Sequence, residues 1–227
     1  MKAFNFSFNR LNLPPQNNEL TTLEARALYA DSFINNVAKY IGSKVLFINE
    51  ATFSISMSTN KNLLSAKKRA DFIGKGFRKA IASMCSAMSI NGLIEHQTRM
   101  MIFDTESFYK FIESVVAKLE KTSMSEAIII MDNACIEKYL KVKELIESKG
   151  HSLICLPPAS AFLNPNEVMY IKWKELIRAK DPQDGNELIK VINKVLSQIA
   201  DNDCKDFYEH MLSYLPRCMK KEEILDQ

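Results

Sequence analysis

The chain has 227 residues, of which 47% are hydrophobic and 25% charged, and its 30 basic and 27 acidic side chains give a formal net charge of +3. This composition is ordinary for a soluble globular protein and excludes the collagen-like, disordered and membrane classes. The length predicts one large domain with additional helices. The net charge is too small to require a nucleic-acid partner, although a local basic patch is compatible with it.

Residue counts exclude several common kinds of site. The six glycines do not form a Gly-x-Gly-x-x-Gly or P-loop pattern, so we expect no nucleotide cofactor held in such a loop. The five cysteines include no Cys-x-x-Cys pair, which argues against a disulfide framework and against a zinc cluster. The sequence contains no signal-peptide pattern and no apolar run long enough to cross a bilayer. We therefore expect an intracellular protein without a membrane partner.

The N-terminal half of the chain predicts one helix followed by strands. Apolar residues at helical spacing indicate the helix, and Thr21 with Glu24 suggests a capping box at its start. The pair Asn91-Gly92 predicts a hairpin turn. In chain order we expect a linker or arm at 1–17, a helix at 22–40, two antiparallel strands at 44–48 and 52–57, a strand at 80–90 and another around 99–103.

The C-terminal half alternates helices and strands. In chain order we expect a helix capped by Thr105 at 105–119, a buried strand at 127–131, a helix at 135–149, a second short buried strand at 152–156, a helix at 165–180 that contains the core residue Trp173, and amphipathic segments at 186–199 and 204–214. Strand, helix, strand is the pattern of a parallel crossover. The whole order predicts an α/β fold with a mixed sheet that is flanked by helices, and with extra C-terminal helices.

Polar residues follow the expected strands where a sheet usually carries its functional groups. Asn49 and Glu50 end the first strand, Asp132 ends the strand at 127–131, and Glu167 opens the helix after the last strand. Because the carboxyl ends of neighbouring parallel strands share one edge, these side chains can converge. Carboxylates at close range repel each other unless a divalent cation lies between them, which predicts a Mg²⁺ site. Taken singly, each residue is equally typical of a helix cap or a helix-dipole contact.

Three strings carry a resemblance to a known family. They are VLFINE at 45–50, IIIMDNA at 128–134 and LPPASAFLNPNE at 156–167, with 34 residues between Asp132 and Glu167. Together they resemble the catalytic domain of Tc/mariner-type transposases and their bacterial insertion-sequence relatives. The resemblance implies an RNase H-like fold, with a mixed sheet of three antiparallel and two parallel strands. It also implies an Asp, Asp, Glu triad that binds Mg²⁺ or Mn²⁺, cuts DNA and joins transposon ends to a target. Asp132 matches the second Asp of this pattern and Glu167 the final Glu.

The resemblance also implies a domain organisation, a partner and a location. The catalytic domain would span residues 18–182, after an arm at 1–17 that normally connects to DNA-reading modules, and residues 183–227 would form a C-terminal helical extension. DNA would be the partner, and the resemblance leaves open a homo-oligomer assembled on it. In a eukaryote the protein would be nuclear.

The chain departs from the family pattern at the first triad position, where Asn49 replaces an Asp. Asparagine offers one neutral carbonyl oxygen where a carboxylate could bridge two cations, so we expect impaired metal binding and catalysis. Glu50 should point to the opposite face of the strand, and only a bulge or register slip would let it substitute. Other positions also differ from the family: Glu137 stands where a His is usual, Ala161 where a Pro is usual, and Asn166 where an Ile is usual.

Basic residues are the candidates for contact with the DNA backbone. Residues 67–79 carry six basic side chains against one acid, and two more lie on the helix that contains Glu167. Solvated lysines on a surface loop and helix explain the same pattern equally simply. The candidate DNA-binding residues are Lys67, Lys68, Arg69, Lys75, Arg78, Lys79, Lys174 and Arg178.

Three functions are compatible with these residues. The first is a transposase catalytic domain impaired by Asn49. The second is a relic or domesticated protein that keeps the fold to bind DNA or protein without catalysis. The third is an α/β phosphoacceptor module that uses Asp132, but this class has no place for the Leu-Asn-Pro-x-Glu string that ends at Glu167.

Overall fold

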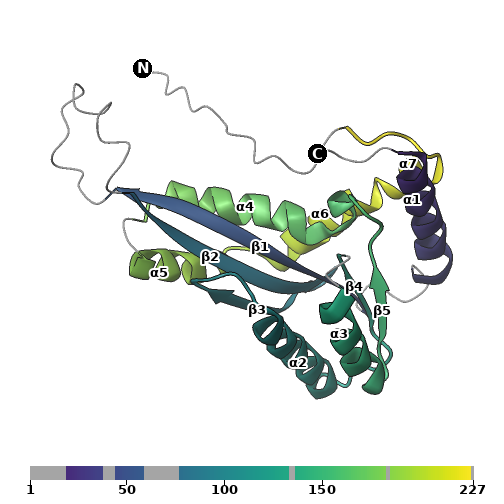
Figure 1. The fold of residues 1–227 in the computed structure, drawn as a ribbon, viewed down its shortest axis with the longest axis horizontal. Coiled ribbons are helices and arrows are strands. Elements are labelled where there is room, and N and C mark those ends of the chain that lie inside the picture. The colour runs from purple at the N-terminus through teal and green to yellow at the C-terminus, as the bar shows by residue number, and fades with distance from the viewer. Residues whose placement is uncertain (1–18, 38–43, 59–76, 133–135, 183–184, 226–227) are drawn as a thin grey trace.

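The computed structural model describes residues 19–37, 44–58, 77–132, 136–182 and 185–225 (Figure 1). Its centre is a five-stranded mixed sheet with the strand order β3-β2-β1-β4-β5. The strands are β1 (Val45–Ser58), β2 (Phe77–Ser89), β3 (Gly92–Arg99), β4 (Ile128–Met131) and β5 (Ser152–Cys155). Strands β3, β2 and β1 pair antiparallel, whereas β1, β4 and β5 pair parallel. This confirms the expected mixed α/β sheet.

The first strand differs from the prediction. We expected two strands separated by Asn49-Glu50, but β1 is one strand that runs through both residues and pairs with β2 in an unbroken register from Phe47↔Met88 to Ser58↔Phe77. The polar pair interrupts the apolar run in sequence, yet the pairing with β2 continues through both residues. The hairpin prediction at Asn91-Gly92 was right, but β3 begins at Gly92 itself and has ended before residues 101–103.

Helices cover both faces of the sheet. Helices α2 (Thr105–Lys121) and α3 (Ile136–Ser148) cover one face, where they pack on Leu46, Ile48 and Ile129. Among the described residues, the helices that pack on the opposite face of the sheet or on its covering layer are α1 (Leu20–Ser32), α4 (Pro165–Ala179), α5 (Gly185–Leu196), α6 (Asp201–Leu212) and α7 (Leu215–Met219). Trp173 of α4 is fully buried in this second layer, as predicted.

Several element boundaries differ from the prediction in instructive ways. Helix α1 begins after Glu19 without a side-chain cap, so the capping box expected at Thr21 and Glu24 is not formed. The N-cap of α2 is Asp104, whose carboxylate accepts from the Ser107 N–H at 2.8 Å, and not Thr105. Strand β5 is partly exposed because it lies at the edge of the sheet.

The C-terminal helices belong to the same layered body as the sheet. Buried side chains of α5 and α6 share one core cluster with β1, β2 and α4. The short helix α7, which the sequence did not predict, packs on α1. None of the helices formed by the described residues is long and apolar enough to span a membrane.

Candidate active site at the ends of strands β1 and β4

Three predicted site residues come together at one edge of the sheet. The parallel pairing of β1 with β4 ends at Ile48↔Met131, so Asn49 and Asp132 are the next residues on two adjacent strands. Helix α4 runs across this edge, and its first turn brings Glu167 to Asn49. We call Asn49, Asp132 and Glu167 the triad cluster.

Asn49 is bonded directly to the last member of the triad cluster. Its side chain is 7% exposed, and Nδ2 donates a short hydrogen bond to Oε1 of Glu167. Its Oδ1 accepts from the Glu50 N–H at 2.9 Å. The side-chain amide therefore presents a donor toward Glu167, at the position where a metal ligand would present an oxygen.

The two carboxylates of the triad cluster lie in an environment that disfavours their charge. Burial raises the pKa of Asp132 above its ordinary value, partly opposed by a hydrogen bond shared with Asn164. Burial also raises the pKa of Glu167, where the hydrogen bond from Asn49 lowers it and the charge of Asp132 raises it further. Oδ1 of Asp132 is buried and has no hydrogen-bond partner among the described residues.

These features fit one hard cation better than two. A buried, unpartnered carboxylate oxygen close to a second carboxylate is the donor set that a divalent cation with oxygen ligands requires. Asn49 contributes no negative charge, and both of its polar atoms already have hydrogen-bond partners. Within the described ranges, no group of three or more His, Cys, Asp and Glu side chains is placed to hold a metal ion.

Glu50 cannot replace the missing carboxylate in this arrangement. Its Oε1 accepts from the Phe103 N–H at 3.2 Å, and Phe103 belongs to the core on the α2 and α3 face of the sheet. The register of β1 with β2 contains no bulge near this residue. Glu50 therefore points away from Glu167, as the alternation of side chains along a strand predicts.

A second group of buried polar residues lies directly beneath the triad cluster, and sequence reasoning missed its role. It consists of Ser86, Asn164, Asn166 and Tyr170, which we call the support cluster. Asn164 caps α4 by accepting from the Asn166 N–H at 3.2 Å, and Asn166 donates to the Phe47 carbonyl at 2.9 Å. The Asn-Pro pair at the helix start was the available signal for the cap. Local sequence offered no signal for the contacts with β1 and β2.

The loop before α4 is held from the other side by a buried arginine. Arg26 of α1 is 1% exposed; its Nε donates to Oγ of Ser160 at 3.0 Å and its Nη2 to the Ala159 carbonyl at 2.6 Å. Its guanidinium also lies 5.1 Å from the centroid of the Phe162 ring. Helix α1 therefore fixes the segment that leads into Glu167, a role that the sequence did not reveal.

The predicted DNA-binding residues are only partly described by the structure. Lys174 is half-buried on α4; burial lowers its pKa, while the charge of Glu167 acts in the opposite direction. Arg178 is exposed, with its guanidinium 5.8 Å from the Phe53 ring centroid. Arg78 and Lys79 lie on β2, but their side chains are outside the described set. Lys67, Lys68, Arg69 and Lys75 fall outside the described residues, and so does the side chain of Glu137.

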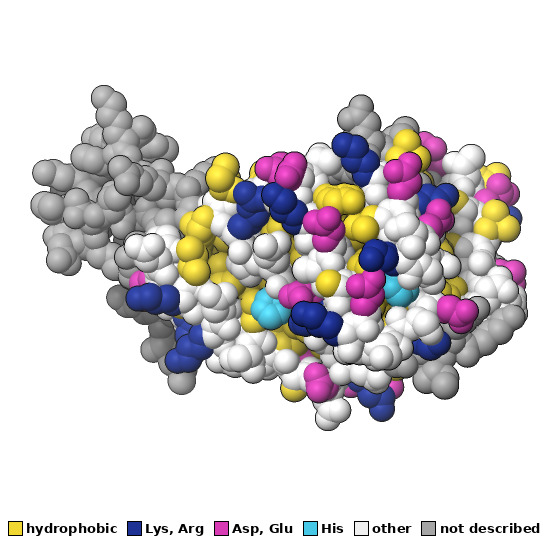
Figure 2. Space-filling model, turned by 90° about the horizontal axis from the view of Figure 1, so that it is seen from below, with side chains coloured by type: hydrophobic (Ala, Val, Ile, Leu, Met, Phe, Trp, Pro, Cys, Tyr) yellow, Lys and Arg dark blue, Asp and Glu magenta, His cyan; other side chains and the backbone are white. Residues whose placement is uncertain are grey.

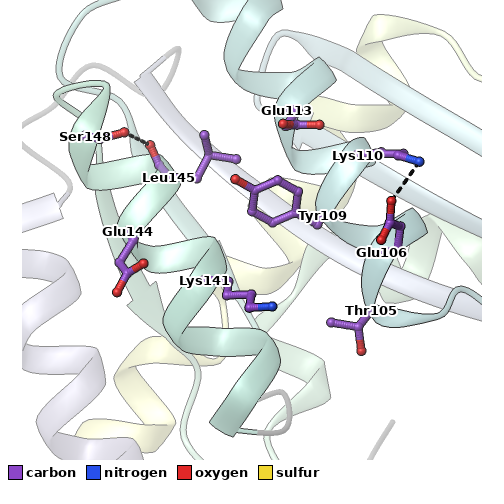
Figure 3. A pocket seen from close by; sticks show the side chains of 9 residues that line it. All are labelled: Thr105, Glu106, Tyr109, Lys110, Glu113, Lys141, Glu144, Leu145 and Ser148. Carbon is purple, nitrogen blue, oxygen red and sulfur yellow. Dashed lines mark hydrogen bonds and ion pairs between the residues drawn. The ribbon is translucent and has the colours of Figure 1, made fainter.

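Other surface features lie away from the triad cluster. An open groove runs between α2 and α3, where Tyr109 faces Leu145 and charged side chains of both signs line the rim (Figure 3). These helices cover the face of the sheet opposite to α4. The surface seen from below likewise interleaves basic and acidic side chains (Figure 2).

Comparisons with known proteins bear on the family and the fold of the chain. A family model described as "DDE superfamily endonuclease" matches residues 44–189, more than half of the chain. No curated protein matches the chain in sequence. Among solved structures, the fold is similar to a Mos1 transposase paired-end complex with the left transposon end, at a TM-score of 0.69 and 10% identity, covering 100% of this chain and 68% of that chain.

Two structures of an isolated catalytic domain match almost end to end. The catalytic domain of Mos1 mariner transposase has a TM-score of 0.69 at 10% identity and covers 91% of this chain and 97% of its own. The same domain solved with raltegravir and Mn has a TM-score of 0.69 at 10% identity, covering 92% and 98%. These matches confirm the RNase H-like fold predicted from the sequence.

Proposed function

Because the chain belongs to the family of DDE superfamily endonucleases, we propose that it is the catalytic core of a DNA transposase whose metal site is weakened by Asn49. DNA is the substrate in this proposal, and residues 18–182 form the catalytic domain. The observation that carries it is the hydrogen bond from Asn49 to Glu167 beside Oδ1 of Asp132, which has no partner among the described residues. In this proposal Asp132 and Glu167 would serve as carboxylate ligands of a metal, and Asn49 would leave the site one negative charge short.

Asp132 and Glu167 would hold a divalent cation, Mg²⁺ or Mn²⁺. A cation held there would supply the positive charge that polarises a phosphodiester and activates water or a 3′-hydroxyl for in-line attack. The residues of this chain would orient the cleaved strand: Lys174 lies on the same helix as Glu167, close enough for their charges to interact, and can reach a backbone phosphate. Asn49 would occupy the third ligand position without supplying the charge that a second cation needs.

The test of this proposal is restoration of the missing carboxylate. The native chain and its Asn49→Asp variant would be incubated with supercoiled plasmid and Mn²⁺, and nicked product measured over time. We expect the variant to nick the plasmid in a metal-dependent way that the native chain lacks. The matched control is Asn49→Asp combined with Asp132→Asn, which should be inactive. A variant that folds but does not nick at any Mn²⁺ concentration would contradict the proposal.

A second candidate function is DNA binding without catalysis. It is favoured by the same hydrogen bond, because the Asn49 amide stabilises Glu167 without any metal. This function requires that Asp132→Ala leave the affinity for duplex DNA unchanged in Mn²⁺ as well as in EDTA, whereas charge reversal at Lys174 and Arg178 lowers it. Fluorescence anisotropy with a labelled duplex at several salt concentrations distinguishes the two candidates.

A further inference from the structure

The first turns of α4 are bonded to three consecutive backbone carbonyls of β1. Asn166 Nδ2 donates to the Phe47 carbonyl at 2.9 Å, and Asn164 Nδ2 donates to the Ile48 carbonyl at 3.1 Å. The Tyr170 hydroxyl donates to the carbonyl of Asn49 itself at 2.6 Å. Phe47 and Ile48 are the last residues of β1 that pair with β4, and Asn49 follows them, so side chains of α4 and of its N-cap anchor β1 up to the triad position.

The same side chains are fixed from β2 by Ser86. In the sheet register Ser86 lies opposite Asn49, and side chains of directly paired residues project from the same face. Its Oγ donates to Oδ1 of Asn166 at 2.7 Å and lies 2.8 Å from the Tyr170 hydroxyl oxygen. Ser86 and Asn166 are both completely buried. The Asn at position 166, where the family pattern has an apolar residue, therefore has a dedicated donor for its carbonyl oxygen.

We propose that Ser86 and Asn166 are positioning residues that fix the direction of the Glu167 side chain against position 49. Asn166 immediately precedes Glu167, and its amide is bonded to Phe47, Asn164 and Ser86. Hydrogen bonds to two strands and to the N-cap of its own helix restrict the rotation of the first helical turn more tightly than an apolar contact would. The side-chain amide of Asn166 is thus hydrogen-bonded through both its nitrogen and its oxygen.

The first experiment uses the native chain and needs no metal. The side-chain amide of Asn49 gives an NMR signal that is assigned by its loss in Asn49→Asp, and its exchange with solvent reports on the bond to Glu167. We expect Ser86→Ala to accelerate this exchange about tenfold. The matched control is Ser83→Ala, because Ser83 is equally buried on β2 but its hydroxyl lies near Thr52. This control should leave the Asn49 signal unchanged.

The second experiment, which rests on the proposed function, measures Mn²⁺ binding by calorimetry in the Asn49→Asp background. We expect Ser86→Ala to raise the dissociation constant about tenfold, as is typical when groups that orient a metal ligand are removed. Ser83→Ala should not change it. If Ser86→Ala lowers only the melting temperature, and neither the exchange nor the affinity changes, the two residues are merely structural and the inference is overturned.

The outcomes separate this inference from the proposed function. If Ser86→Ala accelerates exchange of the Asn49 amide but Asn49→Asp binds no Mn²⁺, the positioning role stands and the proposed metal site fails. Should Ser86→Ala not fold, Tyr170→Phe removes one hydroxyl from the same cluster while keeping the ring that packs near Trp173. We expect Tyr170→Phe to accelerate solvent exchange of the Asn49 side-chain amide as well, and an unchanged exchange rate would contradict the inference.

Discussion

Two groups of buried polar side chains lie at the same end of β1, and their hydrogen bonding differs. In the support cluster, Asn166 has partners on β1, on β2 and at the cap of its own helix, and Ser86 and Tyr170 bond to it or to β1. In the triad cluster, Oδ1 of Asp132 has no partner among the described residues, and burial raises the pKa of both carboxylates. The support cluster therefore holds the start of α4 rigidly, whereas the triad cluster carries the electrostatic cost of buried carboxylates, which a bound cation would remove.

The largest effect on stability should come from the support cluster. Asn166→Leu removes the amide that bonds Phe47 and leaves the Ser86 hydroxyl without its acceptor. We expect a loss of roughly 3 kcal/mol in the free energy of unfolding, because buried polar groups lose their partners. Urea denaturation measures it. Asn202→Leu, at an exposed position of α6, is the control and should change stability little. Equal losses of stability in Asn166→Leu and Asn202→Leu would contradict a special contribution of the support cluster.

The triad cluster should respond in the opposite direction. Asp132→Asn replaces a buried carboxylate that has an unpartnered oxygen with a neutral group of the same size. In EDTA at neutral pH we expect the metal-free protein to gain about 1 kcal/mol in stability, since the cost of burying the charge is removed. Thermal unfolding measures the gain, with Asp206→Asn on exposed α6 as the control. A clear destabilisation by Asp132→Asn would show that the carboxylate is well satisfied without a metal.

The advantage of Asp132→Asn should depend on pH. A raised pKa in the folded state means that the folded protein holds this proton over a pH range where the unfolded chain has released it, so stability falls as pH rises through that range. The loss of stability caused by the buried Asp132 carboxylate is absent below the ordinary Asp pKa of 3.8 and is complete above the raised pKa of the folded state. The stability difference between native chain and variant should therefore shrink toward zero near pH 4. A difference that stays constant with pH would exclude this origin.

The smallest effect concerns DNA binding beside the triad cluster. Lys174→Ala should reduce the slope of log affinity against log salt by about 0.9, the value for one lost phosphate contact. Fluorescence anisotropy with a labelled duplex measures the slope. Lys141→Ala, in the groove between α2 and α3, is the control on the opposite face and should leave the slope unchanged. If both substitutions reduce the slope equally, DNA does not prefer the α4 side.

Much of the triad cluster was predictable from sequence because its residues follow local rules. Asp132 directly follows a buried strand, Glu167 follows an Asn-Pro helix start, and parallel neighbours bring their ends to one edge. The continuity of β1 through Asn49 was not predictable, because its pairing with β2 and not an apolar pattern maintains the strand there. The role of Ser86 likewise depends on how closely α4 approaches the sheet, which no local pattern encodes.

The central claim is that one missing charge at position 49 weakens an otherwise preserved metal site. Anomalous diffraction from crystals soaked in Mn²⁺ tests it most directly, with the native chain and Asn49→Asp treated identically. We expect a strong Mn peak between position 49, Asp132 and Glu167 in the variant. In the native chain, where Asn49 still bonds Glu167, we expect a weaker peak or none. No peak in the variant, or equal peaks in both proteins, would contradict it.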